Sequence, residues 1–212
     1  GTVVVFAGLG LLAARPHLAD RVLGPLERRL PERFAHKVVA LLLETAHLPW
    51  KTEKARSLRH EAARAAVEKL NAADRAIAIY LSLIDEDPHD DEAVKNLVAL
   101  YETGGRRQDL LDLKRRLVGS AKDLRGRLHI RLEVAPLEDE LGAVSKAIEA
   151  LRENLSESGR HEATVKMLAQ FLQREERKSE LETLLASQAE LAERAEDKKI
   201  ASDFFQRAAE VA

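Results

Sequence analysis

The sequence contains no cysteine, and this absence excludes disulfide bonds, thiolate zinc sites and a cysteine nucleophile. Aromatic residues are also scarce, at 4% of the 212 residues, whereas Asp, Glu, Lys and Arg together make up 33%. Such a composition favours an all-α protein over a β-sandwich or a β-barrel. An excess of one charge sign is missing as well, since 34 Lys and Arg face 36 Asp and Glu, for a net charge of −2. We therefore expect no nucleic-acid binding driven by bulk positive charge.

Residues 2–14 form an uncharged apolar run, but these 13 residues are fewer than the about 20 that a membrane-spanning helix needs. Three interpretations stay open for this run: the end of a membrane helix, the core of a signal peptide, or a buried helix or strand. Six Lys and Arg residues between positions 15 and 37 would place the remainder in the cytoplasm if a membrane helix preceded them. We expect a cytoplasmic protein, with membrane association through residues 1–14 as the open alternative.

Four of the six prolines lie within the first 50 residues and divide them into short helical pieces. Residues 1–47, apolar and rich in arginine, resemble the helical membrane region of lysylphosphatidylglycerol synthases and flippase-like proteins. The segment around Trp50 marks a boundary, because proline nearly disappears after it. We therefore divide the chain into an N-terminal helical segment, residues 1–50, with a membrane-proximal region as one alternative for it, and a second region, residues 54–212.

Beyond Trp50 the apolar residues recur at helical spacing, in stripes about a third of a helix wide. Three such stripes are Ala76, Ile77, Tyr80 and Ile84; Leu110, Leu113 and Leu117; and Ala147, Ile148, Leu151 and Leu155. Breaks between helices are expected at Pro88, Gly104, Gly105, Gly142 and Gly159. Helices separated by such short turns predict a row of helical hairpins. No segment alternates in polarity for long enough to predict a strand.

The hairpins are expected to repeat along the chain. Two pairs of segments align: 73–84 with 144–155, at a spacing of 71, and 91–102 with 161–172. The second alignment places Leu97 opposite Met167 and Tyr101 opposite Phe171. A spacing of about 70 residues corresponds to two units of about 35, each made of two helices.

Within one such stretch, a small residue and an aromatic precede a proline, and leucine, tyrosine and glycine follow. These residues are Ala76, Tyr80, Pro88, Leu97, Tyr101 and Gly105. Their order resembles the tetratricopeptide repeat family, although Val94 stands where the family has Trp and Val98 where it has Gly. The resemblance implies an all-α α-solenoid, a TPR-like superhelix of stacked hairpins over residues 54–212. Pro136 falls inside one expected helix and should kink it.

Catalytic motifs are incomplete in this chain. His60-Glu61 and His161-Glu162 begin like the zinc-binding motif HExxH but lack its second histidine, so we expect surface residues there and no metal. The segment from Gly8 to Ala13 matches a dinucleotide-binding fingerprint only in form, since no βαβ unit follows it. We expect neither an enzyme nor a cofactor.

Two charged segments have simpler interpretations. Residues 85–92 are acidic, and we expect a turn there in which Pro88 ends one helix and Asp90 or Asp91 caps the next. Residues 106–131 are basic, and since no aromatic residues interleave with them we expect a solvated ridge. An anionic partner or lipid headgroups are the alternative for this basic region.

By the family's pattern, a protein or peptide partner binds the concave face made by the first helices of successive hairpins. The residues expected to contact the partner are Glu61, Ala65, Glu68, Glu92, Lys95, Ala99, Glu102, His129, Val165 and Ala169. Their largely acidic character favours a basic or amphipathic segment as the partner. We thus expect a protein-interaction scaffold. The alternative is a rigid spacer or oligomerisation module of a membrane-anchored protein.

Overall fold

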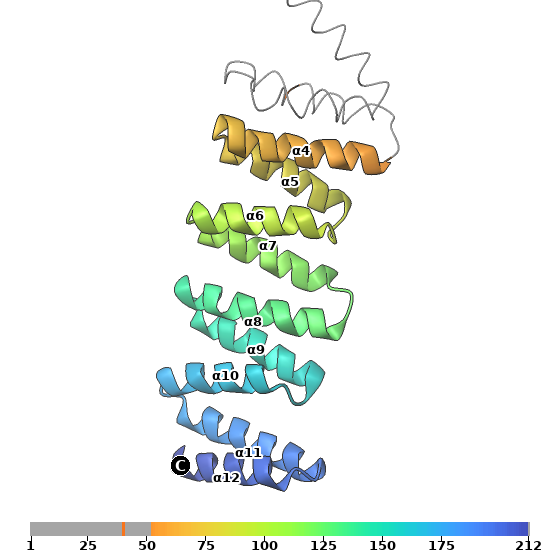
Figure 1. Ribbon diagram of the computed structural model, residues 1–212. Coiled ribbons are helices and arrows are strands. Elements are labelled where there is room, and N and C mark those ends of the chain that lie inside the picture. Colours follow the sequence, from red (N-terminus) through yellow and green to blue (C-terminus); the bar gives the residue numbers. More distant parts are fainter. Residues whose placement is uncertain (1–39, 41–51, 212) are drawn as a thin grey trace, which may run out of the picture. The chain divides into compact units, whose positions relative to one another are not determined.

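The computed structural model describes residue 40 and residues 52–211, which form nine α-helices and no strand (Figure 1). The helices are α4 (Thr52–Leu70), α5 (Ala73–Glu86), α6 (Asp91–Thr103), α7 (Arg107–Ser120), α8 (Leu124–Glu140), α9 (Val144–Ser158), α10 (Glu162–Arg174), α11 (Lys178–Arg194) and α12 (Lys198–Val211). The all-α helical-repeat architecture expected from the sequence is therefore confirmed for this part of the chain.

Apart from residue 40, the N-terminal segment of residues 1–50 lies outside the described residues. The interpretations of the apolar run, the dinucleotide-like fingerprint and the resemblance to lysylphosphatidylglycerol synthases all fall on this segment. No helix among the described residues combines the length and the hydrophobicity that crossing a bilayer requires.

The chain divides into two compact units between Leu100 and Tyr101, inside α6. In the first unit, α4 packs on α5, and the beginning of α6 follows. In the second unit, every helix from α7 to α12 packs on the next one along the chain. Turns of only two to four residues join these helices, so neighbouring helices form the hairpins that the periodicity predicts.

The turn between α5 and α6 shows why one helix ends and the next begins. The Asp87 N–H donates to the Leu83 carbonyl oxygen at 2.9 Å and closes α5 just before Pro88. The Asp90 Oδ1 atom then accepts a hydrogen bond from the Ala93 N–H at 3.0 Å, which makes Asp90 the N-cap of α6. The predicted helix end at Pro88 is confirmed, and of the two candidate caps, Asp90 and Asp91, the structure shows Asp90.

Left-handed residues close several other helices. Asn71 and Gly105 have φ values of 49° and 65°, as expected for residue types that tolerate this conformation after a helix. Glu176 and Glu196 also have positive φ values, 55° and 59°, although glutamate gives no such signal in the sequence. Pro136 lies inside α8, which continues to Glu140, so this proline does not end the helix.

The helices agree with a 71-residue spacing and correct one alignment. α5 and α9 begin 71 residues apart, and so do α6 and α10. At this spacing Leu97 matches Leu168 and Tyr101 matches Leu172, and all four side chains are buried. The alignment that set Leu97 opposite the partly buried Met167 is therefore wrong by one residue.

Small residues bring the helices of the first unit together. Ala62, Ala63 and Ala66 of α4 are fully buried, and so is Ala76 of α5. Short side chains at a helix contact allow a small distance between the helix axes.

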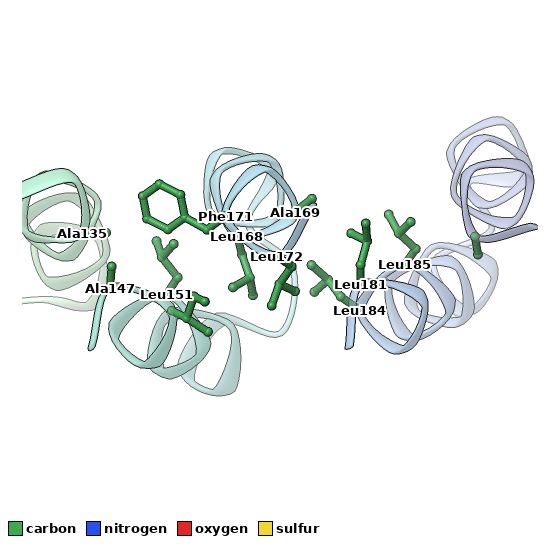
Figure 2. Close-up of a cluster of buried hydrophobic side chains, with 12 residues drawn as sticks. Ala135, Ala147, Leu151, Leu168, Ala169, Phe171, Leu172, Leu181, Leu184 and Leu185 are labelled. Atoms are coloured by element: carbon green, nitrogen blue, oxygen red, sulfur yellow. The ribbon is translucent and has the colours of Figure 1, made fainter. Parts of the chain in front are cut away.

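The core of the second unit is a cluster of leucines and alanines with Ile148 and Phe171, contributed by α8 to α12 (Figure 2). Leu151 of α9, Leu168 and Leu172 of α10, and Leu181 and Leu185 of α11 are each no more than 5% exposed. Burying one such side chain stabilises the fold by about 1.5–3 kcal/mol. Because each helix contributes to two neighbouring contacts, the core runs from helix to helix.

Candidate functional site

The predicted contact residues fall partly on the surface and partly in the core. The exposed ones are Glu68, Glu92, Lys95, Ala99, Glu102 and His129, and the half-buried ones are Glu61 and Ala65. Most of them lie on two helices, α4 and α6, at spacings of three, four or seven residues that place side chains on one helix face.

Val165 and Ala169 are corrected by the structure, because they are only 3% and 5% exposed and belong to the core of the second unit. Their selection follows from aligning α6 with α10 one residue out of register, which turns a helical position by about 100°. In the observed register, the positions equivalent to Lys95 and Ala99 are two other residues. These are Lys166 and Gln170, and both are exposed.

In the first unit, the hydroxyl of Tyr80 on α5 interacts electrostatically with predicted contact residues of both α4 and α6. The Tyr80 side chain is 1% exposed, and burial is the main reason why the pKa of its hydroxyl is raised above the ordinary value. The nearby carboxylates of Glu92 on α6 and Glu68 on α4 raise this pKa further, and Arg64 lowers it. Carboxylates from two helices therefore act on one tyrosine. We refer to Glu68 and Glu92, together with Glu61 seven residues before Glu68 on the same face of α4, as the acidic face.

Next to this tyrosine lies a buried polar pair that the sequence analysis missed. His60 is 6% exposed, and its Nε2 atom lies 3.0 Å from Oδ2 of Asp90, which is itself 7% exposed. The His60 ring stands 6.0 Å from the Tyr80 ring, centroid to centroid. The expectation of a surface histidine is wrong. The available signal was its spacing of three and six residues from the buried Ala63 and Ala66, which puts His60 on the buried side of α4.

The His60 ring lines a surface recess of about 410 Å³ in the first unit. Four acidic residues and two arginines contribute to its walls, so its formal charge is negative: Glu53, Asp90, Asp91, Glu92, Arg56 and Arg64. Arg56 is engaged in ion pairs, at 3.0 Å with Asp87 and at 3.8 Å with Asp90. The recess therefore offers more carboxylate than free cation to a ligand.

In the second unit, α8, α9 and α10 correspond to α4, α5 and α6 of the first unit. Their junction also contains buried polar side chains, but these are different residues with different hydrogen bonds. Asn154 is fully buried, and its Nδ2 donates to the Leu128 carbonyl oxygen at 2.9 Å and to Thr164 Oγ1 at 3.2 Å. His161, 71 residues after Asp90, contacts the same Thr164 Oγ1 at 2.8 Å through Nδ1. Each group here has a partner inside the chain, so this junction joins helices and offers no open acceptor.

The basic region of residues 106–131 is largely paired with acidic side chains of its own unit. Lys114 Nζ lies 2.6 Å from Glu133, and an Arg115 nitrogen lies 2.7 Å from Glu138. Hydrogen bonds from Arg131 and then Arg127 hold the pKa of Glu157 below its ordinary value. These pairs link α7 to α8 and α8 to α9, which supports a structural role over recruitment of an anionic partner.

Among the described residues, no cluster of three or more His, Asp and Glu side chains is arranged to hold a metal ion. Of the two half-motifs, His60 is buried in α4, and His161 precedes the first turn of α10.

No family model matches the chain, and no curated protein matches its sequence. Solved structures similar to it include a MamA RS-1 ArsTM double mutant, with 15% identity, coverage of 92% of this chain and 91% of that chain, and a TM-score of 0.38. MamA from Desulfovibrio magneticus RS-1, from residue 41 to its end, has 16% identity, coverage of 92% of both chains and a TM-score of 0.38. MamA MSR-1 C2 has 13% identity, coverage of 85% and 95%, and a TM-score of 0.33. These values are low, and the fold assignment rests on the helices themselves.

Proposed function

We propose that this chain is a protein-interaction scaffold, and that the acidic face of the first unit binds a segment of a partner protein. The observation that supports this proposal best is the position of Glu68 and Glu92. They lie on two different helices, both are exposed, and both act on the pKa of the same buried tyrosine, Tyr80. Negative charge from two helices therefore acts at one place in the first unit.

The chemistry of the acidic face indicates the kind of partner. Glu61, Glu68 and Glu92 supply negative charge, and the neighbouring Ala65 and Ala99 leave room for a chain to approach the helices. A basic or amphipathic segment complements this surface, since opposite charge speeds encounter and disfavours wrong partners. The helices are packed before the partner arrives, so most of the ordering cost falls on the partner segment.

The proposal is tested by reversing the charge of the acidic face in the double variant Glu68→Lys/Glu92→Lys. Captured partners from native extract are compared between the full chain and this variant. The matched control is Asp74→Lys/Asp85→Lys on α5, which changes the net charge equally, with one substitution in the first turn of a helix and one in the last, as in the test variant.

A partner retained by the control and lost by the test variant supports the proposal. Equal retention by both variants, with helix content unchanged by circular dichroism, contradicts it. Loss in both variants indicates non-specific charge attraction and contradicts it as well.

A further inference from the structure

The Asp90 carboxylate fixes where the hydrogen sits on the His60 ring. Its Oδ1 accepts the Ala93 N–H at 3.0 Å, and its Oδ2 lies 3.0 Å from His60 Nε2. An ionised carboxylate only accepts hydrogen bonds, so Nε2 carries the hydrogen and donates it. In the neutral ring, Nδ1 is then a hydrogen-bond acceptor.

This Nδ1 acceptor has no hydrogen-bond partner among the described residues, although the His60 side chain is only 7% exposed. Buried polar atoms in folded proteins are nearly always hydrogen-bonded, and an unmade bond destabilises the fold. A ligand that brings an N–H donor to this atom therefore recovers an interaction that the free chain lacks.

A second acceptor lies beside the first one. Glu92 Oε1 is 3.7 Å from His60 Nδ1, too far for a hydrogen bond between them but close enough for one donor group to contact both. The Glu92 side chain is 52% exposed, so it is free to shift and admit a ligand. Both atoms belong to residues that line the recess, whose walls carry more acidic than basic side chains.

We propose that the recess binds a cationic side chain of the partner, a lysine ammonium or an arginine guanidinium, with His60 Nδ1 and the Glu92 carboxylate as its acceptors. This assignment rests on the function proposed above and names the partner group that the acidic face recognises. A cation with several N–H donors satisfies both acceptors at once and also pairs with the negative charge of the walls, whereas an apolar side chain or an ionised carboxylate has no donor to offer.

The test is a titration of the full chain, labelled with ¹⁵N, at neutral pH and followed through the ring nitrogens of His60. The probes are acetyl-Gly-Gly-Lys-Gly-Gly-amide and its arginine counterpart, and the controls replace the central residue by norleucine or by glutamate. We expect a free Nδ1 without hydrogen, and a shift of its resonance with lysine or arginine peptides alone.

Variants assign the effect to the two acceptors. Glu92→Gln should weaken binding of the lysine peptide about fivefold, the upper range for a solvent-exposed ion pair. The same change on α11, Glu182→Gln, should leave binding unchanged, because Glu182 is exposed in the second unit. Both substitutions concern exposed residues, and unchanged thermal unfolding verifies that each variant folds.

Several results would overturn the inference. A ring of His60 that is doubly protonated in the free chain leaves no acceptor. Equal binding of the norleucine or glutamate peptide removes the need for a cation, and absence of any binding removes the site. Peptide binding that moves amides of Lys95 and Ala99 but not the His60 ring overturns the recess while leaving the acidic face as a binding surface. Partner capture that is lost in Glu68→Lys/Glu92→Lys, with no effect of the peptides on His60, separates the two proposals in the same way.

Discussion

The Asp90 carboxylate makes two hydrogen bonds at once, and its replacement by alanine gives the sharpest test of the first unit's structure. Its carboxylate caps α6 through the Ala93 N–H and accepts from His60 Nε2, both at 3.0 Å. Loss of an N-cap costs about 1 kcal/mol. Loss of the histidine's partner leaves a buried N–H without a hydrogen bond, which lowers the free energy of unfolding by about 1–3 kcal/mol. We therefore expect Asp90→Ala to destabilise the unit by about 2–4 kcal/mol.

Two companion variants separate the causes. Asp90→Asn retains an oxygen for the cap, and its amide can face His60 in the ring's other tautomer, so we expect a loss of about 1 kcal/mol or less. Asp91→Ala removes a neighbouring carboxylate that is exposed, and we expect a change within about 0.5 kcal/mol.

Hydrogen exchange is the suitable assay, because a chain of repeats does not always unfold in one step. The most protected amides of α4 and α5 should exchange about 30-fold faster or more in Asp90→Ala, which corresponds to a loss of at least about 2 kcal/mol. Equal exchange in Asp90→Ala and Asp91→Ala would refute the reasoning, since it would show that the buried pair contributes nothing beyond an exposed charge.

Three further predictions concern burial and ionisation. Leu151 is fully buried, so Leu151→Ala should destabilise the second unit by about 2–5 kcal/mol in urea unfolding. Leu141 is 39% exposed, so Leu141→Ala should change the free energy of unfolding by less than about 0.5 kcal/mol, and equal effects of the two substitutions would contradict the described core. Asn154→Ala should cost about 1–3 kcal/mol, because a fully buried amide loses its hydrogen bonds, and a neutral effect would show that they are not formed. The raised pKa of Tyr80 predicts that its contribution to stability is constant below about pH 10 and is lost as the pH rises through the folded-state pKa. Glu92→Gln should lower this pKa in an alkaline titration followed by NMR of the tyrosine ring, and an unchanged value would contradict the proximity of the two groups.

The regular features of the fold follow from local rules and were accessible from sequence. Ala76, Ile77, Tyr80 and Ile84 form one helical stripe, and all four are buried. Pro88, Gly105, Gly142 and Gly159 lie between helices, where proline and left-handed glycine fit the backbone geometry. Where residue type and position agree in this way, a single sequence is enough to place a helix and its buried side.

The missed features depend on information that residue types do not carry. Met167 and Leu168 are both apolar, so the hydrophobic pattern alone did not fix the register of α10, and one residue of error moved Val165 and Ala169 from the core to the predicted surface. The turn at Glu176 adopts a left-handed conformation that its residue type does not signal.

The buried histidine was missed for a different reason. A polar residue at the edge of an apolar stripe is usually exposed, and burial becomes favourable only when a partner satisfies it. The partner of His60, Asp90, is 30 residues away and caps another helix, α6. The pairing is therefore a property of the packed unit, and only the structure reveals it.

Site-specific photo-crosslinking in native extract tests most directly whether the acidic face and the neighbouring Ala99 contact the partner. A photoreactive residue replaces Ala99 on α6 or, as a matched control, Ala78 on α5, since both alanines are exposed and belong to the first unit. We predict a discrete crosslinked partner from position 99 that is absent from position 78 and is lost when Glu68 and Glu92 are replaced by lysine. A partner crosslinked from position 78 and not from position 99 would contradict the proposed binding face.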